Sequence, residues 1–302
     1  NTLWRDLNLT GDWHQGQSQS LFDSEQQDLS SNDATYKLMA DLIERFQDAK
    51  TFGSLIEVPN EWKASLTALL EELSELTNSG DIMQKAAAQR LVPIVQQARV
   101  LAQRYNVVVA NPPYMGSKGM NKALKDFAKK AYPNSKSDLF AIFIERCIEL
   151  AVHRGYAALV TIQNWMFLSS FEPLRKKLIS ESYISSLVQI GYNSFPELNS
   201  KVVQAAASVF VKEKNDNAIG CYVNVNNASQ SADKKCEFLS RLMQGDIYKV
   251  CTNKFKKVPG RPIAYWASNS VINSFEKNAS LSKNLETREG LTTGSNEKFL
   301  RF

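Results

Sequence analysis

The four residues Asn111-Pro112-Pro113-Tyr114 have types and a spacing that suit the chemistry of a nucleobase amine. An exocyclic amine carries two N–H groups that each need an acceptor, and the side-chain oxygen of Asn111 and the backbone carbonyl of Pro112 can supply both. The fixed φ of Pro113 holds that carbonyl rigidly. Two acceptors on one amine localise its lone pair for attack, and Tyr114 offers an aromatic face on which the base can stack. This chemistry needs no ionisable base, and neither His nor a carboxylate stands next to the four residues.

The same four residues also suit a purely structural role. Two prolines cannot continue a strand ladder, and Asn favours turns, so they could simply end a strand. Their position favours function, because they directly follow the apolar run 107–110, which predicts a strand buried on both faces. In an α/β sheet, ligands bind at the carboxyl ends of such strands.

The elements around this motif predict an α/β fold. Apolar, β-branched runs predict strands at 107–110, 156–162, 184–190 and 202–211, and helical patterns at 138–152 and 172–179 separate the first three. This alternation is typical of a doubly wound sheet. Weaker patterns predict a strand at 221–225 and helices at 236–243 and 270–277.

The residues before position 106 predict packing helices and no chemistry. Residues 11–33 are rich in Gln, Ser and Asp and predict a loop. Apolar residues at steps of three and four then predict helices from 34 onward, after Pro59, and over 81–104. We therefore expect residues 1–105 to form a loop and a helical insertion.

The composition excludes several classes of protein. The chain has 302 residues, 43% hydrophobic and 22% charged, which is ordinary globular composition. No apolar run approaches the ~18 residues needed to cross a membrane, and the first residues lack a secretory pattern. Four cysteines without a CxxC pair and only two histidines give no reason to expect a metal site. We expect a cytoplasmic protein with reduced thiols and no membrane partner.

Charge is distributed unevenly along the chain. Residues 1–105 contain 9 Lys and Arg against 15 Asp and Glu, whereas residues 106–302 contain 27 against 16. The second part could therefore face a polyanion, although a basic face is more often simply solvated.

Four segments in the second part resemble one family of enzymes. VVVANPPY (107–114), SKSDLFAIFIER (135–146), GYAALVTIQNWMFLSSFEPLRKKLI (155–179) and GYNSFPELNSKVVQAAASVFV (191–211) occur in the order seen in adenine-specific DNA N6-methyltransferases that use S-adenosylmethionine. The run NPPYMGSKGMNKALKDFAKK looks closest to the PglX-type methyltransferases of BREX phage-defence systems. Restriction enzymes with fused methyltransferases are similar too. The resemblance implies a partial Rossmann-like class I methyltransferase sheet over 106–213.

The resemblance also implies roles for individual residues. Asn111 and Pro112 would bind the amine, Tyr114 would stack on a flipped adenine, and Phe195 would close over the base. Asn111 and Phe143 would contact the cofactor, and Phe143 would pack on the adenine ring of the cofactor. Phe143 equally suits a core position, since Phe140, Ile144 and Ile148 share its helical spacing, and Phe195 could instead plug the edge of the core.

Six lysines follow the motif with only Asp126 opposing them: Lys118, Lys122, Lys125, Lys129, Lys130 and Lys136. A DNA duplex with an extruded base would bring phosphates to this loop, so we expect Lys118, Lys122, Lys125 and Lys129 to contact them. A solvated basic helix is the alternative.

One departure from the family concerns the cofactor. The glycine-rich turn and the acidic residue that hold it lie upstream of the motif in this family, yet the glycines of 1–105 are isolated. The chain begins with Asn, and GLTTGSNEKFLRF resembles the segment that leads into a target-recognition domain. We expect a piece of a larger enzyme that transfers nothing alone, with insertion 1–105, partial core 106–213 and lead-in 214–302.

Two functions are expected for the parent protein. The first is methyl transfer to adenine N6 in duplex DNA in phage defence or restriction-modification, with other defence subunits as possible partners. The second is a non-catalytic DNA-binding or assembly module, which would keep the base pocket but lack the cofactor contacts.

Overall fold

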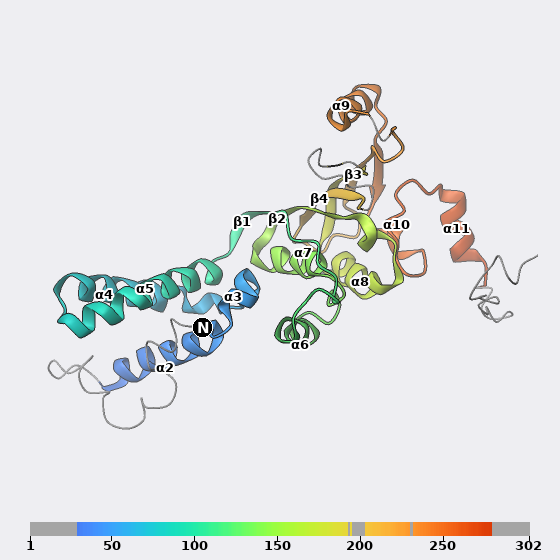
Figure 1. Ribbon diagram of the computed structural model, residues 1–302. Coiled ribbons are helices and arrows are strands. Elements are labelled where there is room, and N and C mark those ends of the chain that lie inside the picture. The colour runs from blue at the N-terminus through green and yellow to red at the C-terminus, as the bar shows by residue number, and fades with distance from the viewer. Residues whose placement is uncertain (1–28, 193, 195–202, 230–231, 280–302) are drawn as a thin grey trace, which may run out of the picture.

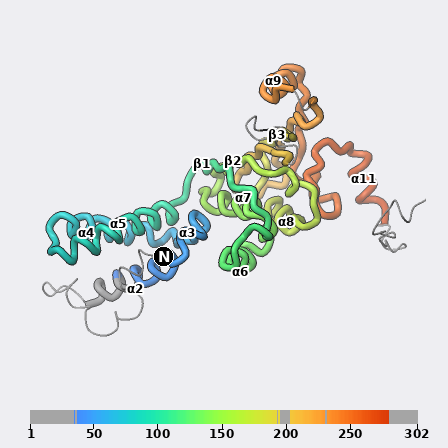
Figure 2. The backbone as a smooth tube through the Cα atoms, viewed as in Figure 1, coloured from blue at the N-terminus to red at the C-terminus, as the bar shows by residue number. Residues whose placement is uncertain are grey.

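The computed structural model describes residues 29–192, 194, 203–229 and 232–279. It has two parts, which we call the helical arm (residues 29–102) and the sheet region (residues 105–279). Figure 1 shows the arm projecting to one side of the sheet region, and Figure 2 shows the backbone running from the last helix of the arm straight into the first strand.

The helical arm confirms the three helices predicted before residue 106. Its helices are α2 (Leu29–Phe46), α3 (Ala49–Phe52), α4 (Lys63–Ser79) and α5 (Ile82–Ala102), with short 3-10 turns at Gly53–Leu55 and Asn60–Trp62. A capping box starts α5, because Asp81 Oδ1 accepts from Gln84 N at 2.8 Å and Gln84 Oε1 accepts from Asp81 N at 2.9 Å. Apolar side chains of the arm form their own core, including Leu66, Val95, Ala98 and Ala102, all fully buried.

The sheet region contains one six-stranded mixed sheet, which confirms the α/β class. Its strands are β1 (Tyr105–Ala110), β2 (Ala151–Ile162), β3 (Tyr183–Gly191), β4 (Ala205–Val211), β5 (Ile219–Asn224) and β6 (Tyr248–Cys251), in the spatial order β1-β2-β4-β3-β5-β6. β1 is parallel to β2 and β3 is parallel to β5, whereas β4 runs antiparallel to both of its neighbours and β6 antiparallel to β5. β5 and β6 extend the same sheet beyond residue 213.

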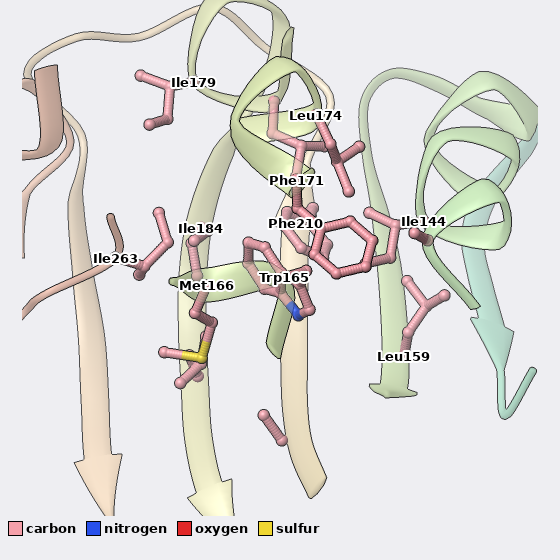
Figure 3. Close-up of a cluster of buried hydrophobic side chains, with 14 of the residues drawn as sticks. Ile144, Leu159, Trp165, Met166, Phe171, Leu174, Ile179, Ile184, Phe210 and Ile263 are labelled. Atoms are coloured by element: carbon pink, nitrogen blue, oxygen red, sulfur yellow. The ribbon is translucent and has the colours of Figure 1, made fainter. Parts of the chain in front are cut away.

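Helices cover one face of this sheet. They include α7 (Leu139–Leu150) and α8 (Glu172–Glu181), with 3-10 turns at Gln163–Met166 and Ser169–Phe171. Figure 3 shows the core beneath them, a cluster that includes Trp165, Phe210, Leu174 and Ile179. The ring centroids of Trp165 and Phe210 lie 5.7 Å apart. The remaining helices of the sheet region are α6 (Lys122–Ala131), α9 (Lys234–Gln244), α10 (Asn253–Lys256) and α11 (Asn269–Lys277).

The expectation that the first strand is buried on both faces is wrong for the described part of the chain. Val107 is 56% exposed and Val109 is 77% exposed. Both lie on β1, the edge strand of the described sheet, on the face that α7 and α8 do not cover. The described residues therefore bury only one face of β1.

The arm is attached to the sheet region by a buried arginine and by apolar contacts of Phe52 and Leu55. Arg146 on α7 is 1% exposed, and its guanidinium donates to Ser54 O at 2.9 Å and to Ile56 O at 2.7 Å. Nearby, the rings of Phe52 and Phe127 stack with centroids 4.6 Å apart. The segment between α3 and α4 is therefore held on α6 and α7.

None of the helices in the described ranges is both long enough and apolar enough to span a membrane.

Candidate functional site

The Asn-Pro-Pro-Tyr motif lies at the carboxyl ends of two neighbouring parallel strands. Ala110, the last residue of β1, pairs with Leu159 of β2, so Asn111 begins the loop that leaves this edge of the sheet. Pro112 is buried and Asn111 is exposed. The side-chain amide of Asn111 has no hydrogen-bond partner among the residues described, which leaves its oxygen available to a ligand.

Tyr114 is fixed at the same edge by two contacts. Its hydroxyl donates to the backbone carbonyl of Val160 on β2 at a long 3.5 Å, and its ring meets that of Phe140 at 89° with centroids 6.3 Å apart. Burial raises the pKa of the Tyr114 hydroxyl above its ordinary value of 10.0, so the group stays neutral at physiological pH. Part of the ring remains exposed, as a stacking surface requires.

Asp138 positions the loop that follows the motif, and the sequence analysis did not identify it as a site residue. Its Oδ1 accepts from Met115 N at 3.1 Å and from Phe140 N at 3.3 Å, which also caps α7. Leu139 N donates to Met115 O at 2.9 Å, and Gly116 forms a β-bridge with Asp138. Burial raises the pKa of the Asp138 carboxyl, while these backbone N–H groups oppose the rise. The only signal in the sequence is an Asp at the start of a helical pattern, where it commonly serves as a cap.

Phe143 lies between two groups of core residues. It is half-buried and packs both on the core under α7 and α8 and on a smaller cluster that includes Leu55, Leu124 and Tyr132. Phe140, one helical turn earlier, contacts Tyr114. These contacts fit the core alternative, and contact with a cofactor ring stays a prediction.

The basic residues after the motif lie mostly on a helix rather than in the expected loop. Lys122, Lys125 and Lys129 recur at steps of three and four on α6, so they share one side of it. Leu124 and Ala128 of the same helix are buried, and Asn121 caps it by accepting from Leu124 N at 2.8 Å. This amphipathic arrangement turns the lysines away from the core.

The exposure of the individual lysines varies little. Lys118, in the loop before α6, is exposed, as are Lys122, Lys129, Lys130 and Lys136, whereas Lys125 is half-buried. Lys129 lies 3.7 Å from the carboxylate of Asp126, with both side chains largely exposed. An exposed pair of this kind contributes little stability and leaves the lysines able to meet phosphates.

Two further expectations concern Phe195 and the glycine-rich cofactor turn. Phe195 lies outside the described residues. No glycine-rich strand-to-helix turn occurs in residues 29–104, where every regular element is a helix.

Over the part of the chain that the structure describes, no group of three or more His, Cys, Asp or Glu residues could hold a metal ion. Cys147 is buried, which raises the pKa of its thiol to about 12.

Comparisons with known proteins connect this site to one family. The family model of the Eco57I restriction-modification methylase matches residues 14–195, more than half of the chain. The adenine-specific methyltransferase BrxX of Escherichia coli O9:H4 (strain HS) is 43% identical over 99% of this chain and 24% of its own length. The adenine-specific methyltransferase PglX of Lacticaseibacillus casei (strain Zhang) is 34% identical over 87% of this chain and 22% of its own length.

The chain thus spans about a quarter of the length of these curated relatives. Among solved structures, the nuclease-deletion mutant of the Type ISP restriction-modification enzyme LlaGI, in complex with a DNA substrate mimic, is similar to the chain with a TM-score of 0.42. That match has 16% sequence identity and covers 67% of this chain and 21% of the other.

Proposed function

Because the chain belongs to the Eco57I restriction-modification methylase family, we propose that it is the base-binding part of an enzyme that methylates adenine N6 in DNA. The observation that carries this proposal is the position of Asn111: its exposed side chain lies at the carboxyl edge of β1, next to a buried proline and a half-exposed tyrosine. The names of both curated relatives, adenine-specific methyltransferases, support adenine as the base.

In this proposal the chain binds and orients the adenine. Asn111 Oδ1 and the Pro112 carbonyl accept the two N–H groups of the amine, and the rigid Pro112-Pro113 backbone keeps the two acceptors in place. Accepting both protons localises the nitrogen lone pair, which then points at the electrophile. Tyr114 stacks on the extruded base, and its hydroxyl is held by Val160 so that the ring does not rotate into the site.

S-adenosylmethionine, when bound, supplies the methyl group that this amine attacks. We assign contact with the reacting end of that cofactor to Asn111, which is exposed, and contact with its adenine ring to Phe143, whose side chain is half-exposed. The described residues do not offer a glycine-rich turn for its methionine part. We infer that the remaining contacts come from other parts of the whole protein, since the curated relatives are about four times as long as this chain.

DNA is the proposed partner, held through its phosphates by Lys118, Lys122, Lys125 and Lys129. The likeness to the adenine-specific methyltransferases BrxX and PglX supports a role in phage defence or restriction-modification, and we propose that the protein acts in the cytoplasm, with other subunits of such a system as possible partners. A non-catalytic DNA-binding module is the second candidate, favoured by the lack of a cofactor turn in residues 29–104.

A single substitution tests the proposed role of the motif. In the full-length protein, Asn111→Ala should lower the rate of adenine methylation by roughly 10²- to 10³-fold, because the reacting centre loses one of its two acceptors. Asn106→Ala is the matched control, since Asn106 is also exposed and lies on the strand that leads to the motif.

Both variants should melt at the temperature of the wild-type protein, because neither asparagine packs in the core. A rate for Asn111→Ala close to that of Asn106→Ala would refute the role. A wild-type protein that binds DNA but transfers no methyl group would favour the non-catalytic module.

A further inference from the structure

A chain of hydrogen bonds, mostly buried, joins β3, the turn after β2, the residue before β4 and a distant loop near the carboxyl ends of β2 and β3. The Tyr265 hydroxyl donates to Gln189 Oε1 at 2.7 Å, and Gln189 Nε2 donates to Gln163 Oε1 at 2.7 Å. Gln163 Nε2 in turn donates to Gln204 Oε1. Tyr265 is 1% exposed, and Gln163 and Gln189 are each 5% exposed. Gln189 and Gln163 each accept at the oxygen and donate from the nitrogen, and Gln204 accepts at the end of the chain, so all three bonds run in one direction.

Burying these hydrogen-bonded side chains costs free energy, and their hydrogen bonds specify one arrangement of the residues. Buried amides destabilise a core unless their polar atoms are hydrogen-bonded, and here each is bonded to the next. Apolar side chains of the same size would fill this space without that requirement. A fully satisfied buried network instead fixes the relative positions of its members, because any shift leaves a polar atom unpaired.

A buried arginine makes a second connection between the loop that contains Tyr265 and the turn that contains Gln163. Arg175 on α8 is 1% exposed, and its Nη1 donates to Trp165 O at 2.9 Å and to Leu168 O at 2.7 Å. Its Nε and Nη2 donate to Gly260 O at 2.9 and 2.7 Å. In addition, Ile263 N donates to Met166 O at 2.9 Å. The segment 260–265 is thus held against the turn that follows β2.

The end of β2 is also where Tyr114 is held. Val160, whose carbonyl accepts from the Tyr114 hydroxyl, lies on β2 three residues before Gln163. Gln163 N donates to Gln204 O at 2.9 Å, so both the backbone and the side chain of Gln163 bind this end of β2 to the start of β4. A displacement of the hydrogen-bonded chain therefore displaces the carbonyl that orients Tyr114.

We propose that Tyr265, Gln189 and Gln163 are positioning residues, which fix the carboxyl end of β2 and thereby hold Tyr114 in the geometry required for methyl transfer. This inference rests on the proposed function. None of the three residues needs to touch the base or the cofactor. A misplacement of about 1 Å at a reacting centre can cost about 10²-fold in rate, so a partial shift should produce a measurable loss.

Two neighbouring tyrosines provide a matched pair of variants. The rings of Tyr222 and Tyr265 stack with centroids 5.0 Å apart, and both side chains are fully buried. The Tyr222 hydroxyl, unlike that of Tyr265, has no hydrogen-bond partner among the residues described. Tyr265→Phe and Tyr222→Phe thus each remove one buried hydroxyl from this stacked pair, and only the first breaks the chain of hydrogen bonds.

The experiment measures steady-state methylation of duplex DNA by the full-length protein with S-adenosylmethionine. Tyr265→Phe should lower kcat about tenfold, with KM for DNA within about twofold of wild type, because the lysines proposed to hold the DNA phosphates are unchanged. Tyr222→Phe should keep the wild-type kcat. Gln189→Met should lose at least as much kcat as Tyr265→Phe, and the double variant should lose no more than Gln189→Met alone, since both act through one chain.

Three results would overturn the inference. They are equal kcat values for the two tyrosine variants, a loss confined to KM, and independent additive losses in the double variant. A wild-type protein without any methyl transfer would overturn the proposed function itself, and the positioning role with it. The two failures are distinguishable because only the second affects the wild-type protein.

Discussion

The helical arm and the sheet region are stabilised in different ways. In the arm, α4 and α5 bury Leu66, Val95 and Ala98 among other apolar side chains, and Asp81 and Gln84 serve as a helix cap. The sheet region buries a network of polar side chains as well, including Gln163, Gln189 and Arg175, and concentrates it at one edge of the sheet.

This difference shows in which region the exact positions of side chains matter most. An apolar core tolerates small shifts of its members, whereas a hydrogen-bonded network does not. Gln163 and Gln189 lie near the carboxyl ends of β2 and β3, at the same edge as Asn111 and Tyr114, the residues proposed to meet the base. We infer that the arm contributes packing and attachment, and that precise geometry is confined to the sheet region.

The attachment of the two regions gives the largest expected effect on stability. Arg146→Ala removes the two hydrogen bonds to Ser54 O and Ile56 O and should lower the free energy of unfolding by about 3 kcal/mol. Urea denaturation followed by circular dichroism measures this change.

Arg154→Ala is the control for charge removal. Arg154 is an exposed arginine whose Nε lies 2.9 Å from Glu213 Oε1, so its removal should cost less than about 1 kcal/mol. Equal losses of stability in the two variants would mean that the arm does not depend on Arg146 for its attachment.

The lysines of α6 give the next effect, on DNA binding. Replacing Lys122, Lys125 and Lys129 by Gln should lower the slope of log affinity against log salt by about 2.7 on duplex DNA, because each phosphate that is no longer neutralised accounts for about 0.9. Fluorescence anisotropy over a range of salt concentrations gives the slope.

The arm provides the control for this triple variant. Lys50 on α3 and Lys63 on α4 are both exposed on the arm, and their replacement by Gln should leave the slope unchanged. An unchanged slope in the α6 variant would show that its lysines are only solvated.

Asp138 gives the smallest effect, and its sign depends on pH. Burial raises the pKa of Asp138 above its ordinary 3.8, so the folded protein keeps this proton to a higher pH than the unfolded chain. The stability that this group contributes is full below its ordinary pKa and is lost as pH rises through the raised value. Asp138→Asn keeps an oxygen acceptor for Met115 N and does not titrate.

The melting temperature of the wild-type protein, relative to that of Asp138→Asn, should therefore fall as pH rises from the ordinary pKa of an Asp carboxyl toward neutrality. Differential scanning fluorimetry across this range measures the difference. Asp138→Ala, which lacks the acceptor, should be less stable than both by about 1 kcal/mol because the helix cap is removed. A relative melting temperature that rises with pH would contradict the assigned environment of Asp138.

Much of the arm and of the strand-helix alternation could be predicted from the sequence, because the signals are local. Leu66, Leu69 and Leu73 repeat at helical spacing, and Asp81 with Gln84 forms a capping box within four residues. The apolar run before Asn111 likewise marked a strand that ends at the motif.

The features that the sequence did not reveal all depend on long-range contacts. The position of β4 between β2 and β3 follows from strand pairing across the sheet, and the exposure of Val107 follows from β1 lying at the edge of the described sheet. Gln163, Gln189 and Tyr265 are separated by 26 and 76 residues, so no local pattern connects them. Their hydrogen bonds exist only once the sheet has formed.

The central claim is that the Asn111–Tyr114 edge binds adenine and presents its exocyclic amine for methylation. The most direct measurement is mass spectrometry of the nucleosides from duplex DNA that has been incubated with the full-length protein and S-adenosylmethionine. We predict N6-methyladenine as the product, and its absence from a parallel reaction with Asn111→Ala. A methylated cytosine in place of methylated adenine, or undiminished N6-methyladenine from Asn111→Ala, would contradict the account.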